Sequence, residues 1–236
     1  MSTDVTRDFA FGLPKAELHL HLEGTLEPDL KLALARKNGV DIGQSTVEEV
    51  QATYQFNDLT SFLAVYYPAM DVLQDEDDFH DLAAAYFERA RANGVVRAEC
   101  FFDPQAHTSR GIAIETVIRG YHRAVVEARE AGLSADLILC FLRDMSAQSA
   151  LETLQAALPY KDMFIGVGLD SDERDNPPTK FAEVFALARE AGLHVTMHCD
   201  IDQVGSIDNI RAALIELGAE RLDHGTNIVE DPELVA

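Results

Sequence analysis

Features of a secreted or membrane protein are scarce in this chain of 236 residues. It has three cysteines, Cys100, Cys140 and Cys199, which lie far apart and form no Cys-x-x-Cys pair. This spacing argues against a disulfide framework and fits a reducing compartment, so we expect a cytoplasmic protein. No apolar run reaches the length of a membrane span. The first residues, MSTDVTRDFAFGLPK, also lack the basic and then apolar pattern of a secretory signal.

Basic residues are also few, with 19 lysines and arginines against 41 acids and a net charge of −22. A surface this acidic repels phosphate backbones, so we expect no nucleic acid polymer and no membrane as a partner. The charge does not exclude a small neutral base or nucleoside, and it also simply favours solubility. With 47% hydrophobic residues and no repeat or linker, residues 1–236 are expected to form a single domain around one core.

Short apolar segments alternate with amphipathic ones along the chain. The expected strands are 16–22, 95–102, 135–142, 163–169, 194–199 and 221–225. Apolar residues recur every three or four positions in the expected helices, which are 76–94, 114–133, 146–158, 179–193 and 207–219. This order implies parallel strands joined by helical crossovers. The long segment 25–94 is expected to add extra helices over the site.

Polar residues follow every expected strand, and this distribution distinguishes a barrel from a doubly wound sheet. They are His19, His21, Glu23, Asp103, Gln105, Arg143, Asp144, Asp170, Ser171, Asp172, Glu173, His198, Asp200 and His224. A doubly wound sheet gathers its ligand at one switch point, whereas a barrel uses the carboxyl ends of all its strands. We therefore expect an α/β fold, a (β/α)8 TIM-type barrel, with about six of its eight strands in this chain.

The stretch KAELHLHLEGTLEPDL, residues 15–30, places His19 and His21 on alternate positions of a strand. Alternate residues share a face, so the two imidazoles can hold one divalent ion, and His198 at a later strand end would complete a set of three. The alternation alone also fits two unrelated surface histidines. Such ligands suit zinc and would accept iron, cobalt or manganese as well.

These motifs together resemble the adenosine deaminase family of the amidohydrolase superfamily, and most closely its bacterial adenine deaminase branch. The matching segments, in order, are LPKAELHLHLEGTLEPDL, AECFFDPQAHTSRGI, LCFLRDMS, GVGLDSDERDNPPTKF and DHGTNIVEDPEL. The resemblance implies a zinc-dependent hydrolytic deaminase with one zinc ion per subunit.

The resemblance also implies roles for individual residues. His19, His21 and His198 would be zinc ligands, and His224 would hold and deprotonate the attacking water. Ser171 and Asp172 lie where the family lines its purine pocket, and Glu23 lies where nucleoside-using members meet the ribose. Asp103, after the second strand, is taken as a further substrate-binding residue.

The chain departs from the family pattern on its fifth strand. The family has His-Ala-Gly-Glu there, and its glutamate protonates the purine ring, whereas this chain reads HCDIDQ and has Ile201 at that position. Isoleucine cannot move a proton, so Asp200 is the expected catalytic replacement because it shares strand parity with His198. Asp200 and Asp202 are equally well read as loop acids.

The family also continues through two more strands, the last of which carries an aspartate ligand, so we expect this chain to be the N-terminal part of a longer protein. The expected reaction is deamination of adenine or a related 6-aminopurine, as base or nucleoside, with release of ammonia. The alternatives are an amidohydrolase acting on a different or N6-substituted ring and a catalytically silent purine-binding relative. A homo-oligomer is compatible with the sequence.

Overall fold

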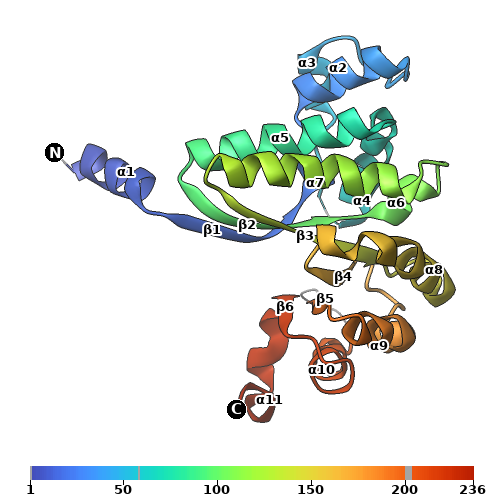
Figure 1. Cartoon of the computed structure of the whole chain (residues 1–236). Helices are drawn as coiled ribbons and strands as arrows, with labels where there is room; N and C mark the ends of the chain where they lie inside the picture. Colours follow the sequence, from blue (N-terminus) through green and yellow to red (C-terminus); the bar gives the residue numbers. More distant parts are fainter. Residues whose placement is uncertain (1, 58, 200–203) are drawn as a thin grey trace.

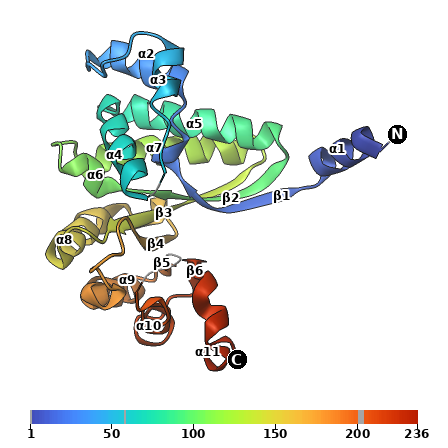
Figure 2. The same cartoon turned by 180° about the vertical axis from the view of Figure 1, so that it is seen from behind.

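A computed structural model describes residues 2–57, 59–199 and 204–236. Its six strands form one parallel sheet in sequence order. They are β1 (Lys15–His21), β2 (Val95–Phe102), β3 (Ser134–Leu142), β4 (Gly166–Asp170), β5 (His194–Cys199) and β6 (Arg221–His224). The sheet curves as a (β/α) barrel does, with helices on its outer side (Figures 1 and 2). The predicted fold class is confirmed, with six strands in the order that the sequence indicated.

Helices connect and cover the strands. They are α1 (Ser2–Gly12), α2 (Pro28–Asn38), α3 (Val47–Ala52), α4 (Leu59–Ala69), α5 (Glu76–Ala92), α6 (Pro104–Thr108), α7 (Ile114–Glu130), α8 (Ala147–Ala157), α9 (Ala182–Glu190), α10 (Ser206–Arg211) and α11 (Pro232–Val235). The extra helices expected after the first strand are α2, α3 and α4. Figure 1 shows α2 and α3 beyond α5, away from the sheet. Among the described residues, no helix has both the length and the apolar character that crossing a bilayer requires.

Several element boundaries differ from the sequence prediction, two of them with a clear local cause. The fourth strand begins at Gly166 because Leu158–Met163 form a 3-10 turn. The last predicted helix, 207–219, is interrupted after α10, where Ala212–Glu216 continue as one π-helical turn. Gly192, two residues after the end of α9, has φ +80°, the left-handed conformation that a helix end favours.

Helices α5 and α7 pack at very close range over the sheet. A Cβ atom built on Gly120 of α7 would lie 2.6 Å from the carbonyl oxygen of Glu76 and from Cβ of Phe79. Only glycine permits this approach, which brings the fully buried Phe79 and Tyr121 rings into edge contact with centroids 5.3 Å apart. The pair of helices thereby forms a rigid cover over β1 to β3.

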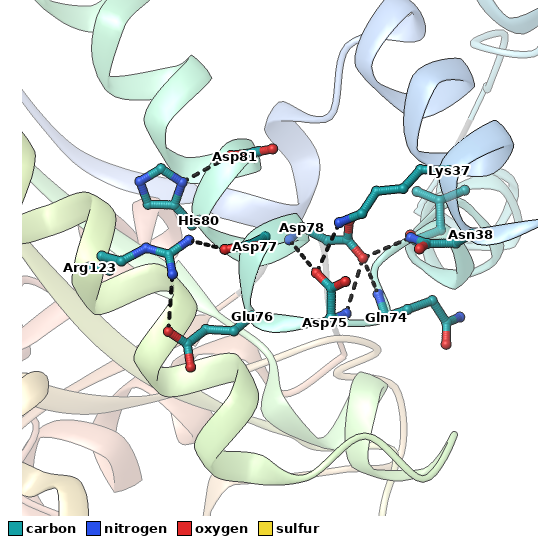
Figure 3. Close-up of polar contacts among 11 residues, drawn as sticks. Lys37, Asn38, Gln74, Asp75, Glu76, Asp77, Asp78, His80, Asp81 and Arg123 are labelled. Atoms are coloured by element: carbon teal, nitrogen blue, oxygen red, sulfur yellow. Dashed lines mark hydrogen bonds and ion pairs between the residues drawn. The ribbon is translucent and has the colours of Figure 1, made fainter.

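The N-terminus of α5 is joined to the end of α2 by the buried carboxylate of Asp78 (Figure 3). Its Oδ1 accepts a hydrogen bond from Lys37 Nζ at 2.7 Å, and Oδ2 accepts one from Asn38 Nδ2 at 2.8 Å. Oδ2 also accepts from the backbone amides of Gln74 and Asp75 at 2.8 and 3.0 Å. This carboxylate thus caps α5 and attaches the α2–α3 segment to the barrel.

Replacing Asp78 by alanine should therefore destabilise the protein strongly. We expect a loss of about 2–4 kcal/mol in the free energy of unfolding, because Lys37 and two amides lose a buried partner. Asp77→Ala is the matched control, since that exposed carboxylate accepts one hydrogen bond from the described side chains, from Arg123 Nη2 at 2.6 Å. Its loss should stay below about 1 kcal/mol. Equal losses in urea denaturation would contradict this role of Asp78.

A second contact between α5 and α7 depends on pH. His80 of α5 places Nδ1 2.9 Å from Asp81 Oδ1 and Nε2 2.9 Å from Glu127 Oε2 of α7. Burial lowers the pKa of His80, but these two carboxylates outweigh it and raise the pKa above its usual value, with Arg123 opposing them. The imidazolium is thus favoured in the folded state.

Since the folded pKa of His80 lies above the unfolded one, its contribution to stability is complete below about pH 6.5 and is lost as the pH rises through the folded pKa. His80→Gln should therefore lose stability relative to the wild type at pH 5.5 and approach it at pH 9. Unfolding free energies measured at both values test this. A difference that does not change with pH would contradict it.

Candidate metal centre

Strands β1 and β5 bring three histidines to one point. His19 and His21 lie two residues apart on β1 and therefore point to the same face, as the sequence indicated. The Nε2 atoms of both lie 3.0 Å from Nε2 of His198, which is the next to last residue of β5. All three belong to the carboxyl ends of parallel strands, where barrel proteins place their chemistry.

The tautomer of His21 indicates what this point can bind. Its Nδ1 lies 3.2 Å from Asp170 Oδ2 at the end of β4, so Nδ1 carries the proton and Nε2 presents a lone pair. His198 Nε2 faces both Nε2 atoms of β1 and can donate at most one proton between them. Lone pairs therefore converge, which is unfavourable unless a cation accepts them. The donor set fits a metal ion of the zinc type, for which imidazole nitrogen is a preferred ligand.

Two imidazoles of the cluster, those of His19 and His198, are kept neutral by their surroundings. Burial, followed by the neighbouring His224 and His21, lowers the pKa of His19 from 6.5 to about 4. Burial and the imidazoles of His21 and His19 also lower the pKa of His198 well below its usual value. Neutral imidazole is the form that binds a metal, so the folded chain holds these side chains in the required protonation state at neutral pH.

His224 lies beside this cluster, at the end of β6. Its ring centroid is 4.7 Å from that of His19 and 5.4 Å from that of His198. A ring nitrogen of His224 is within 4.8 Å of ring nitrogens of the same two histidines. The backbone of His224 has φ +62°, a conformation that L-residues rarely adopt and that often occurs at functional sites.

A cavity of about 450 Å³ opens on the four histidines. Its remaining walls are Leu20, Gly24, Thr25, Phe62, Leu63, Tyr66, Tyr67, Asp103, Asp170 and Ser171. The predicted substrate-binding residues Asp103 and Ser171 are thus part of this cavity. It has the size and the mixture of apolar walls and few polar groups that small-molecule sites share.

Asp103 and Asp170 form a buried acidic pair at the bottom of the cavity, with 2% and 3% of their surface exposed. Burial and the Asp170 carboxylate raise the pKa of Asp103, and burial also raises the pKa of Asp170. A carboxylate oxygen of each lies within 4.8 Å of one on the other and of a ring nitrogen of His21. Tyr66 OH approaches the pair as well, at 3.4 Å from Asp103 Oδ2.

Two of the predicted substrate-binding residues lie elsewhere. Glu23 is fully buried, and its Oε1 accepts from His107 Nε2 and from the backbone amide of Asp103, both at 3.1 Å. It contributes to a separate cavity of about 90 Å³ behind Tyr66. Asp172 accepts from the amide of Arg174 at 3.0 Å in the turn after β4 and is not among the described residues that line the main cavity.

The expected proton donor, Asp200, lies outside the described residues, as do Ile201 and Asp202. The catalytic role given to Asp200 therefore stays a prediction from the sequence.

Sequence reasoning missed two groups that build the site. The first is the cavity wall of Phe62, Leu63, Tyr66 and Tyr67 on α4, for which the aromatic run at 62–67 was an available signal. The second is the structural role of Arg143, a fully buried side chain after β3. Its Nη1 donates to the carbonyl of His198 at 2.9 Å and lies 3.2 Å from Glu173 Oε2. Nothing in the local sequence indicated that this arginine faces inward.

The fold and the histidine cluster together define a (β/α)-barrel protein with a metal site of the kind found in metal-dependent hydrolases. A family model described as adenosine deaminase matches residues 14–236, and the chain belongs to this family.

Relatives support the same assignment. An adenine deaminase of Geotalea uraniireducens is 54% identical over 225 residues, covering 95% of this chain and 63% of its own length. An uncharacterized deaminase of Schizosaccharomyces pombe is 53% identical, with 99% of this chain and 69% of that protein covered. The chain thus spans about two thirds of the length of these relatives.

Solved structures agree. The crystal structure of adenine deaminase from Arthrobacter aurescens superposes with a TM-score of 0.89 at 48% identity, covering 94% of this chain and 68% of that one. A zinc-bound amidohydrolase from Burkholderia ambifaria gives a TM-score of 0.83 at 31% identity, with 99% and 65% covered.

The position of Arg143 leads to a stability prediction. Arg143→Met should lower the free energy of unfolding by about 3–5 kcal/mol, because it removes a buried guanidinium from the carboxylate of Glu173 and from the carbonyl of His198. The control is Arg174→Met, a change at an exposed position in the turn after β4. That variant should stay within about 0.5 kcal/mol of the wild type in urea denaturation. Similar stabilities for the two variants would exclude this role of Arg143.

Proposed function

We propose that this protein deaminates adenine or a related 6-aminopurine by hydrolysis, with one zinc ion per subunit. The observation that carries this proposal is the convergence of the Nε2 atoms of His19, His21 and His198 at the carboxyl ends of barrel strands. Membership of the adenosine deaminase family and relatives named adenine deaminase give the reaction its chemical class.

In this proposal His19, His21 and His198 hold the ion. Bound zinc would lower the pKa of a water molecule toward about 7 and so supply hydroxide at neutral pH. His224 orients this water and accepts its proton at a ring nitrogen, which its place beside His19 and His198 allows. Asp200 donates a proton to the purine ring, a role that rests on the sequence alone.

The chemical change is a substitution at one carbon. A bond forms between the water oxygen and C6 of the purine, the bond from C6 to the exocyclic nitrogen breaks, and this nitrogen leaves as ammonia with the proton that His224 took from the water. Ser171 and Asp103 contact the ring in this proposal because both line the main cavity. Glu23 shapes the wall behind it, and a contact of Asp172 with substrate stays a prediction. An uncharged purine also suits a protein with a net charge of −22, which disfavours polyanions.

Removing one ligand tests the proposal. His198→Ala should abolish stoichiometric zinc binding and lower kcat/KM for adenine at least ~10²-fold. Removing a group that supports a metal ligand can already reduce activity by about that factor, and removing the ligand itself should reduce it no less. The matched control is His194→Ala, at the other end of β5, where the exposed ring contacts only the carboxylate of Glu220 among described side chains. It should keep both zinc and turnover.

Metal analysis and ammonia release from adenine, adenosine and N6-methyladenine are the measurements. Zinc binding without ammonia from any of the three would reject deamination. Release of methylamine from N6-methyladenine alone would move the substrate class to N6-substituted purines.

A further inference from the structure

Helix α4 reaches the polar end of the cavity through two adjacent tyrosines with different partners. Tyr67 OH donates to Ser171 Oγ at 2.8 Å. Tyr66 OH donates to Asp103 Oδ2 at 3.4 Å. Both phenols line the same cavity, yet only Tyr66 is hydrogen-bonded to the buried acidic pair.

From Asp103 the contacts continue to the histidine cluster. A carboxylate oxygen of Asp103 lies within 4.8 Å of one of Asp170 and of a ring nitrogen of His21, and Asp170 Oδ2 is 3.2 Å from His21 Nδ1. The Oδ1 atoms of both aspartates are buried and have no hydrogen-bond partner among the described residues. The Oδ2 atoms of Asp103 and Asp170 contact Tyr66 and His21, respectively, and the two carboxyl groups lie close enough to restrain each other.

We propose that Tyr66 is a positioning residue for the metal centre, acting through Asp103 and Asp170 on the ligand His21. This inference rests on the proposed metal site. A carboxylate that accepts the Nδ1 proton of a ligating histidine fixes the ring and increases the basicity of its Nε2. Asp170 has this relation to His21, Asp103 restrains Asp170, and the hydroxyl of Tyr66 restrains Asp103. The wall that contacts the substrate is thereby connected to the metal.

Tyr67 provides an internal control because it has the same chemistry, helix and cavity but a different partner. Its hydroxyl ends on Ser171, a residue held at φ +72° beyond the end of β4. Removal of this hydroxyl leaves the contacts from Asp103 to His21 in place.

The test measures zinc affinity by competition with a chromophoric chelator, in the wild type and in variants with an unchanged circular dichroism spectrum. Loss of a group that directly supports a ligand typically weakens metal binding about 10–100-fold, and Tyr66 is two contacts further away. We expect Tyr66→Phe to raise the Kd for zinc by about 3–10-fold and Tyr67→Phe to leave it within about 2-fold of the wild type.

A second pair of variants tests the same contacts with an uncharged residue in place of Asp103. Asp103→Asn can still accept from Tyr66 and donate to Asp170, so its zinc affinity should stay within about 3-fold of the wild type. Asp103→Leu has the same number of heavy side-chain atoms but neither function, and should weaken zinc binding at least as much as Tyr66→Phe.

The outcomes separate this inference from the proposed function. Wild-type protein that binds no zinc would overturn both. Wild-type protein that binds zinc, with Tyr66→Phe and Tyr67→Phe equal to each other, would overturn the positioning role alone. Equal losses in Asp103→Asn and Asp103→Leu would do the same, because the affinity would then follow the charge of Asp103 and not its hydrogen bonds.

Discussion

The site depends on one electrostatic constraint, the meeting of imidazole lone pairs at a single point. His19, His21 and His198 come from two strands that are not neighbours in the sheet, and the Nε2 atoms of His19 and His21 each lie 3.0 Å from that of His198. Such an arrangement costs free energy until a cation occupies it, so the fold has to impose it. The barrel does so by fixing strand ends, and Arg143 contributes by binding the carbonyl of His198 from inside.

Much of the fold could be predicted because it follows from local periodicity. Six apolar segments separated by amphipathic ones leave few topologies open, and the right-handed crossover rule selects the parallel order. The direction of His19 and His21 followed from the two-residue period of a strand. The start of β4 was misplaced because the apolar residues 163–165 fit a strand pattern by themselves. In the structure a 3-10 turn extends to Met163, and the strand begins only at Gly166.

Contacts between distant segments could not be predicted in the same way. Whether Glu23 faces substrate or protein depends on His107, 84 positions further along the chain, whose ring binds its carboxylate. The pairing of Asp103 with Asp170 likewise depends on how β2 and β4 are placed within the sheet. A single sequence carries periodicity, whereas such pairings are properties of tertiary packing and have no local signature.

In the proposed function, the acidic pair also lets one pocket serve a cation and an uncharged ring. Burial raises the pKa of both carboxyl groups, and any negative charge that the pair keeps lies next to His21, where it would favour a bound metal. The aromatic wall of α4 adds apolar surface on which a planar base can pack. Because Tyr66 belongs to that wall and contacts Asp103, changes on α4 that alter substrate fit would also act on the metal site.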